Sequence, residues 1–164
     1  MAQTEAPTFI ATGEACRRLN VGRSQLQNLF PLIPYLYVSR RETRLFIGEY
    51  IDGYAAYLRQ QQASPTLATA RAYLATADAQ EIIGRVTGQF NRTLATKITF
   101  TPTELTQLLN IGRMTVTTWH QNKVFPIIKQ KVRPKRDRGK GPREVLLIPS
   151  SELRKALEWK IPRA

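Results

Sequence analysis

The residues Leu-Asn-Val-Gly-Arg at positions 19–23 return as Leu-Asn-Ile-Gly-Arg at positions 109–113. Four of the five residues are identical, and the fifth exchanges valine for isoleucine. The segments are offset by 90 residues, and the register extends outward, because Glu14 aligns with Glu104 at the same offset. A repeat spaced this widely indicates a duplicated domain rather than a solenoid of short units.

Each copy of the repeat predicts two short helices joined by a tight turn. Thr12 is a candidate N-cap of the first helix, and Thr101 followed by Pro102 suits the start of its counterpart. We expect Gly22 and Gly112 to supply backbone freedom in the turns. The apolar residues recur at helical spacing, and the positions expected to be buried are Ala15, Cys16, Leu19, Val21, Leu26 and Leu29 in the first copy and Leu105, Leu108, Leu109, Ile111, Val116 and Trp119 in the second.

A β-hairpin and a further helix are expected after each helix pair. In the first copy, strands over residues 35–38 and 45–47 flank a charged tip, and a helix follows over residues 49–59. In the second copy, strands over 127–132 and 145–148 flank a much longer tip. Ser150 is the expected N-cap of a closing helix that continues through Trp159. Two helices, a hairpin wing and a flanking helix form a winged helix-turn-helix.

We therefore expect a mainly α-helical chain with small β-hairpin wings, an α+β fold. Residues 8–60 form an N-terminal winged helix-turn-helix, and residues 97–161 form a C-terminal one with a long basic wing. Residues 61–96 form a helical linker or dimerisation segment, with helices through 70–74 and 79–90. Its apolar side chains either form a dimer interface or pack on the two modules, and they are Tyr73, Leu74, Ile82, Ile83, Val86 and Phe90.

The charge balance favours a polyanionic partner. The chain has 25 Lys and Arg residues against 12 Asp and Glu residues, a net charge of +13. Nucleic acid is the commonest partner of such a protein, and an anionic membrane is the second. The densest basic stretch lies between Lys129 and Arg143, where Asp137 is the single acid. On double-stranded DNA it would follow phosphates or enter the minor groove, and otherwise it is a solvated loop.

The second helix of each pair is the expected recognition helix, because its N-terminal residues meet base edges in the major groove. Arginine pairs with guanine, glutamine and asparagine pair with adenine, and threonine contacts phosphate, base or a thymine methyl. The expected exposed positions are Arg23, Ser24, Gln25, Gln27 and Asn28 in the first copy and Arg113, Met114, Thr115, Thr117, Thr118 and His120 in the second. The further expected DNA contacts are Arg40, Arg41 and Arg44 in the first wing, Lys123 after the second recognition helix, and Lys135, Arg136, Arg138, Lys140 and Arg143 in the second wing.

The sequence contains no pattern typical of a metal centre, an enzyme active site or a membrane span. There is one cysteine, Cys16, and one histidine, His120, too few for a metal centre built from these side chains. No glycine-rich phosphate loop is present, no nucleophile can be assigned beside His120, and we expect a protein that is not an enzyme. No apolar run is long enough to cross a membrane. We expect a cytoplasmic, nucleoid-associated protein without cofactor, metal or small-molecule effector.

Residues 14–29 with the hairpin that follows, and residues 103–119 with 127–157, resemble the winged helix-turn-helix of the MerR and excisionase-like families. Leu-Leu-Asn-Ile-Gly-Arg-Met-Thr-Val-Thr-Thr-Trp at 108–119 is similar to their turn and recognition helix, and Ile-Pro-Ser-Ser-Glu-Leu at 148–153 to the start of the helix after their wing. Size and charge also resemble the small MerR-type repressors of cyanobacterial CRISPR-associated transposons. The chain lacks the long C-terminal coiled coil of MerR regulators, and it has two modules where they have one per subunit.

The resemblance implies a sequence-specific transcriptional regulator that represses by occupying its operator, as a homodimer or as a single chain that spans two half-sites. One alternative is an excisionase-like architectural factor that bends DNA for recombination or transposition. Another alternative is a structural adaptor whose second module binds protein.

Overall fold

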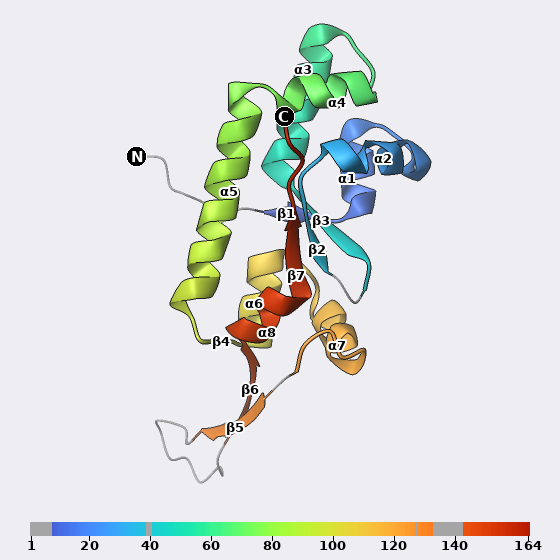
Figure 1. Ribbon diagram of the computed structural model, residues 1–164. Coiled ribbons are helices and arrows are strands. Elements are labelled where there is room, and N and C mark those ends of the chain that lie inside the picture. The colour runs from blue at the N-terminus through green and yellow to red at the C-terminus, as the bar shows by residue number, and fades with distance from the viewer. Residues whose placement is uncertain (1–7, 39–40, 127, 133–142) are drawn as a thin grey trace.

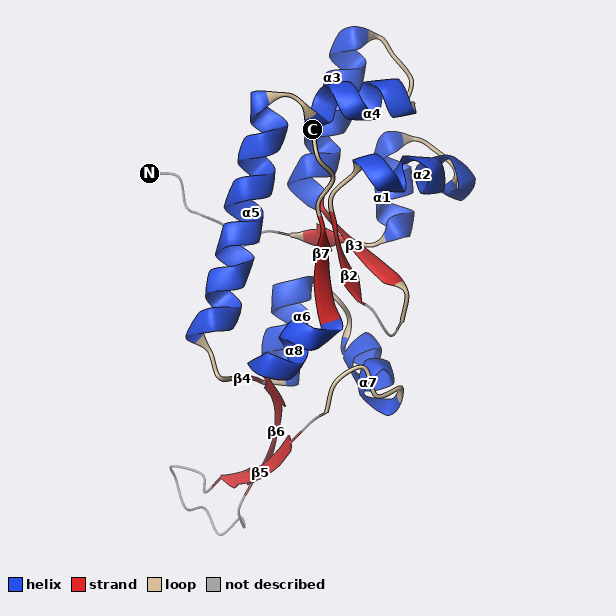
Figure 2. Cartoon of the chain, in the orientation of Figure 1, coloured by secondary structure: helices blue, strands red, loops and turns tan. Residues whose placement is uncertain are grey.

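The computed structural model describes residues 8–38, 41–126, 128–132 and 143–164 (Figure 1). The expectation of a mainly helical chain with small antiparallel sheets is confirmed (Figure 2). One sheet has the strand order β1-β3-β2-β7, and the other has the order β4-β6-β5. All pairs of neighbouring strands are antiparallel.

The first copy of the repeat begins with a short strand and ends with a long helix. Its hairpin, β2–β3, follows the helix pair, and the second hairpin strand pairs back onto β1, with Phe9 opposite Ile47. The elements are β1 (Phe9–Ile10), α1 (Thr12–Leu19), α2 (Arg23–Leu29), the 3-10 helix η1 (Phe30–Leu32), β2 (Tyr35–Val38), β3 (Thr43–Ile47) and α3 (Gly48–Gln61).

The second copy repeats this connectivity. Its first strand pairs with the second hairpin strand, with Phe100 opposite Ile148, as β1 pairs with β3 in the first copy. Helices α1 and α6 begin and end at aligned positions, 90 residues apart, so the sequence repeat is also a repeat of structure. The elements are β4 (Thr99–Phe100), α6 (Pro102–Leu109), α7 (Arg113–Gln121), β5 (Ile128–Val132), β6 (Arg143–Pro149) and α8 (Ser150–Ala156).

The buried faces of the helix pairs match the sequence prediction closely. Leu108, Val21 and Ile111 are half-buried and pack against the core, and the other nine predicted positions are buried. Cys16 is one of these buried residues and is a free thiol. The i, i+3 and i+4 spacing of apolar residues was sufficient to predict the buried positions, because each helix buries a single stripe of side chains.

Two of the three predicted helix caps are wrong. Thr12 is the first residue of α1, and the N-cap is Ala11, without a side-chain cap. Ser150 is likewise the first residue of α8, because β6 runs directly into the helix through the extended backbone of Pro149. Only Thr101 caps as predicted: its hydroxyl accepts from the Glu104 backbone N–H, and the Glu104 carboxylate accepts from the Thr101 N–H.

The tight turns depend on asparagine, and the glycine prediction is wrong. Asn20 (φ 54°, ψ 50°) and Asn110 (φ 53°, ψ 49°) both adopt the left-handed conformation at the end of the first helix. Gly22 has φ −78° and ψ 166°, which any residue can adopt, and Gly112 is similar. Asparagine is among the few residues with a side chain that enter the left-handed region readily. Each copy therefore builds its corner with the same residue and the same geometry.

The middle segment is helical, as predicted, and forms α4 (Leu67–Leu74) and α5 (Ala77–Thr96). Both helices are longer than the predicted ranges 70–74 and 79–90. The six apolar residues that could have formed a dimer interface are all buried within the chain, and none is more than 8% exposed. Packing within the chain, the other alternative for this segment, is therefore what the structure has.

The predicted C-terminal helix ends three residues early. Helix α8 stops at Ala156, and residues Leu157–Lys160 form strand β7. This strand pairs with β2 of the first copy, with Leu36 opposite Trp159. Trp159 packs on Phe9, with ring centroids 5.9 Å apart, and on Phe90, at 5.5 Å. The end of the chain therefore completes a sheet whose other strands lie near its start (Figure 1).

We predict that Trp159→Ala lowers the free energy of unfolding by about 3 kcal/mol, because it removes a large ring from the contact between the two copies. Chemical denaturation of the full chain measures this change. Glu158→Ala, one residue away and exposed, is the control and should change stability by less than about 0.5 kcal/mol. Equal effects of the two substitutions would contradict the packing described for β7.

The turn geometry leads to a second prediction. Asn20→Ala should cost about 1 kcal/mol of stability, and Asn20→Gly much less, because glycine adopts a positive φ without steric penalty. Gly22→Ser should leave stability unchanged or raise it, since the site is open and serine is a good N-cap for α2. A large loss of stability in Gly22→Ser would show instead that the turn needs glycine. Thermal unfolding of the three variants makes the comparison.

Candidate nucleic-acid interface

Helix α2 presents a polar face to solvent. Its five polar residues, Arg23 to Gln25 together with Gln27 and Asn28, are all exposed, whereas Leu26 and Leu29 are buried. The predicted division between outward and inward positions is therefore confirmed for this helix. Arg23, at the first position of α2, has no ion pair among the described residues.

Helix α7 presents a less polar face. Arg113, Thr117 and His120 are exposed, and Met114 is 78% exposed. Thr115 and Thr118 are half-buried, which corrects the expectation that all six positions face solvent.

Two threonine hydroxyls of α7 are engaged with the helix itself. The Thr117 hydroxyl donates to the Arg113 carbonyl at 3.1 Å, and the Thr118 hydroxyl donates to the Met114 carbonyl at 2.8 Å. Each hydroxyl therefore keeps only its acceptor capacity for an outside group.

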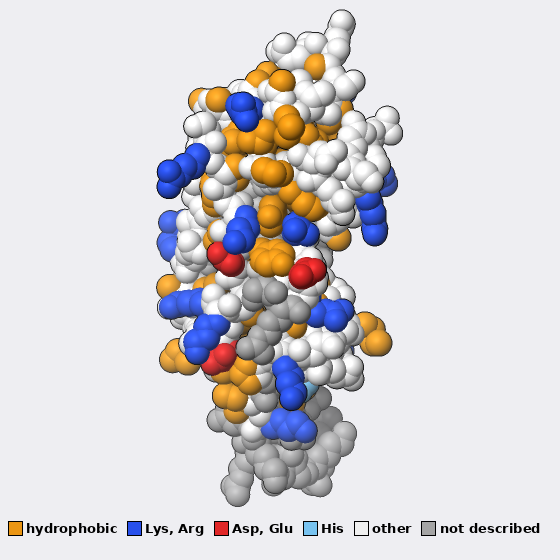
Figure 3. All heavy atoms as spheres, turned by 45° about the vertical axis from the view of Figure 1, so that its right-hand side comes forward, with side chains coloured by type: hydrophobic (Ala, Val, Ile, Leu, Met, Phe, Trp, Pro, Cys, Tyr) orange, Lys and Arg blue, Asp and Glu red, His pale blue; other side chains and the backbone are white. Residues whose placement is uncertain are grey.

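Helices α2 and α7 lie along the same edge of the molecule, at the right of Figure 1, and the β2–β3 hairpin projects between them. Figure 3 turns this edge toward the viewer and shows that Lys and Arg side chains predominate over Asp and Glu there. Helix α5 lies along the opposite edge. The two helices that carry the predicted base-reading residues are thus accessible from one side.

The three predicted arginines of the first hairpin differ in position. Arg41 is exposed, and Arg40 lies outside the described residues. The Arg44 guanidinium lies 4.4 Å from the centre of the Phe30 ring and 5.5 Å from that of Tyr35. Its Nε is buried and finds no hydrogen-bond partner in the described parts of the chain. Arg44 therefore packs on the rings of Phe30 in η1 and Tyr35 in β2, which its prediction as a DNA contact of the first wing did not foresee.

The remaining predicted contacts lie after α7 and in the second hairpin. Arg143 is the first residue of β6. Lys123, after α7, has a positive φ of 58° and lines a hollow of about 330 Å³ with His120 and Glu152. The predicted contacts Lys135, Arg136, Arg138 and Lys140 lie outside the described residues.

Several basic side chains near the helix pairs are already neutralised. Arg17 and Arg18 donate to the Glu14 carboxylate, and these hydrogen bonds lower its pKa to about 2. Arg18 also pairs with Asp52 of α3. At the position aligned with Glu14, Glu104 pairs with Lys97. The acid on the first helix of each pair is thus neutralised by nearby cations, whereas the second helix of each pair begins with an exposed arginine.

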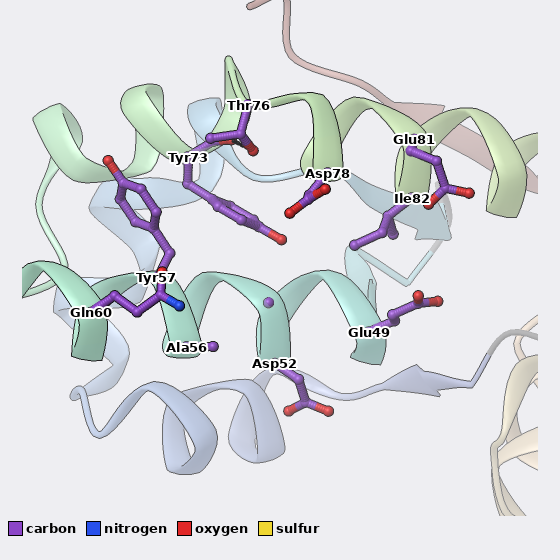
Figure 4. A pocket seen from close by; sticks show the side chains of 11 residues that line it. Glu49, Asp52, Ala56, Tyr57, Gln60, Tyr73, Thr76, Asp78, Glu81 and Ile82 are labelled. Carbon is purple, nitrogen blue, oxygen red and sulfur yellow. Dashed lines mark hydrogen bonds between the residues drawn. The ribbon is translucent and has the colours of Figure 1, made fainter.

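A separate cavity of about 570 Å³ lies between α3, α4 and α5 (Figure 4). Glu49 and Tyr57 line it from α3, Tyr73 from α4, and Asp78 and Glu81 from α5. The sequence did not predict this pocket, because the residues that line it belong to three helices and the sequence pattern does not show how these helices pack together. The one available signal was the i, i+3 spacing of Asp78 and Glu81, which places both on one side of a helix.

Among the described residues, no helix combines the length and apolar character needed to cross a membrane. No group of three or more His, Cys, Asp and Glu residues in those ranges is arranged to hold a metal ion.

In comparisons with family models, with curated proteins and with solved structures, nothing matches the chain.

Proposed function

We propose that this chain is a sequence-specific DNA-binding regulator built from two winged helix-turn-helix modules. Helices α2 and α7 are its recognition helices, the β2–β3 and β5–β6 hairpins are its wings, and it represses transcription by occupying an operator. The observation that carries the proposal is the exposed arginine, Arg23 or Arg113, at the start of the second helix in both copies, after the same asparagine turn.

The chemistry of these positions supports base recognition. The N-terminal residues of a recognition helix approach base edges, and arginine there can donate two hydrogen bonds to guanine. Because Arg23 and Arg113 have no ion pair among the described residues, binding DNA costs no existing ion pair at either position. The net charge of +13 supplies the general attraction to phosphate.

The two copies differ in what they offer to DNA. Helix α2 exposes glutamine and asparagine side chains that can pair with adenine, whereas α7 offers Met114 and threonines with engaged hydroxyls. The second wing carries the denser basic stretch. The first copy therefore contributes more to base preference and the second more to affinity.

A homodimer on a longer operator remains part of the proposal. Helix-turn-helix dimers place half-sites about 34 Å apart, and one chain with two recognition helices can cover two half-sites alone. The apolar residues of α4 and α5 are buried within the chain, so a dimer would form through another surface.

The pairing of β7 with β2 favours a second candidate, an architectural factor of the excisionase type. Because this strand joins the two copies, their recognition helices cannot separate freely. DNA that contacts both must conform to their arrangement, and such deformation costs energy that depends on its sequence.

Footprinting on DNA from the organism's own locus separates the two candidates. A repressor protects one or two sites that overlap a promoter. An architectural factor protects several sites at a recombination region and bends the DNA, which shortens its end-to-end distance in a fluorescence transfer measurement. Absence of protection on all DNA, even at low salt, would exclude both.

Arg23→Ala and Arg113→Ala should each relax base preference at one position and weaken the binding free energy on the preferred sequence by roughly 1–3 kcal/mol. Arg92→Ala on α5, the helix along the opposite edge of the molecule, removes the same charge and is the control. Unchanged base preference in both arginine variants would exclude α2 and α7 as the reading helices.

Neutralising Lys135, Arg136 and Arg138 together should instead flatten the salt dependence of binding to all sequences.

A further inference from the structure

The cavity between α3, α4 and α5 has a charge opposite to that of the whole protein. We call it the acidic pocket and define it by Glu49, Tyr57, Tyr73, Asp78, Glu81 and Ile82. Arg85 pairs with Glu49 at 2.5 Å and with Glu81 at 2.9 Å, so one cation is shared by two carboxylates. Asp78 has no ion pair within the described ranges. Three carboxylates against one guanidinium leave an excess of two negative charges.

The fourth carboxylate near the cavity belongs to a different network. Asp52 points away from Tyr73 and toward α1, as Figure 4 shows, and it accepts from Arg18 at 3.1 Å. It is therefore compensated and outside the acidic pocket as defined. The uncompensated charge lies at Asp78 and at the shared pair Glu49 and Glu81.

The hydroxyl of Tyr73 is a buried polar group without a partner. Tyr73 is 4% exposed, and its hydroxyl finds no hydrogen-bond partner among the described residues. In Figure 4 its ring reaches from α4 across the cavity toward α3, and Asp78 points toward the hydroxyl from α5. Buried hydroxyls are almost always hydrogen-bonded, so an unpaired one that lines a cavity indicates a missing partner.

The local structure holds this hydroxyl in place. Gly53 faces it, and a Cβ at that position would lie 2.1 Å from the Tyr73 oxygen. The Tyr73 ring also stacks on Tyr54 with centroids 5.5 Å apart, and it meets Tyr50 edge-on at 5.0 Å. Burial, together with the charges of Asp78 and Glu49, raises the pKa of Tyr73 to about 12, so the hydroxyl is neutral. It offers lone pairs to a donor in the cavity.

We propose that the acidic pocket binds a small organic cation whose ammonium group donates hydrogen bonds to the Tyr73 hydroxyl and the Asp78 carboxylate. The apolar part of the ligand packs on Tyr57 and Ile82, which line the same cavity. A volume of about 570 Å³ suits a small molecule. An anion is disfavoured by the excess of negative charge, and aromatic walls favour an organic cation over a bare metal ion.

Calorimetric titration of the full chain with benzylammonium and phenethylammonium tests the proposal. At least one of them should bind with a Kd in the millimolar range or tighter, whereas the neutral benzyl and phenethyl alcohols of the same shape should bind at least about tenfold more weakly. Shift changes in an NMR spectrum should centre on residues of α3, α4 and α5. Failure of both ammonium ions to bind, or equal binding of the alcohols, overturns the proposal.

Two isosteric variants and one control locate the site. Asp78→Asn removes the uncompensated charge and should weaken binding about tenfold or more. Tyr73→Phe removes only the hydroxyl, and because that group has no partner, the variant should fold as stably as the parent and bind several-fold more weakly. Glu158→Gln, an exposed acid on β7, should bind as the parent does. Parent-like binding in both pocket variants would overturn the assignment.

Discussion

The contact among Phe9, Phe90 and Trp159 is the interaction on which the arrangement of the molecule depends. The three rings come from the first strand, the longest helix and the last strand, and their centroids lie 5.5–5.9 Å apart. Around them, β7 adds a fourth strand to the sheet of the first copy, and the Asn110 side chain donates to the Phe9 carbonyl at 2.9 Å. The three rings, the β2–β7 pairing and the Asn110 hydrogen bond together hold the two copies against each other.

This constraint determines how the proposed DNA-binding elements are presented. Helices α2 and α7 lie on one edge, and α5 lies along the other (Figure 1). The acid on the first helix of each pair is neutralised: Glu14 by Arg17 and Arg18 of the same helix, and Glu104 by Lys97, which precedes β4. The second helix of each pair instead begins with an exposed arginine, Arg23 or Arg113, that has no ion pair among the described residues.

Helix α3 connects the two proposed sites. On one side Asp52 pairs with Arg18 of α1, the first helix of the α1–α2 pair. On the other side Glu49 and Gly53 line the cavity beside Tyr73. Both sides belong to one rigid helix of 14 residues, so a ligand in the acidic pocket would contact the element that supports the helix pair. The +13 chain gathers three acids here, Glu49, Asp78 and Glu81, and Arg85 compensates only part of their charge.

Local pattern was sufficient to predict the helix pairs with their buried stripes and the polar face of α2, because these depend on residues within a few positions of one another. The repeat and both hairpins were also predicted, the repeat from segments 90 residues apart. The prediction for the turns was wrong, because an Asn-Val-Gly sequence does not show which of its residues adopts the positive φ. Local pattern also extended α8 to Trp159. Residues 157–160 are a strand only because β2, more than a hundred residues earlier, has an open edge and Phe9 and Phe90 leave room for the indole. The aromatic position of Arg44 and the acidic pocket were likewise decided by tertiary packing, which brings together side chains that no sequence spacing relates.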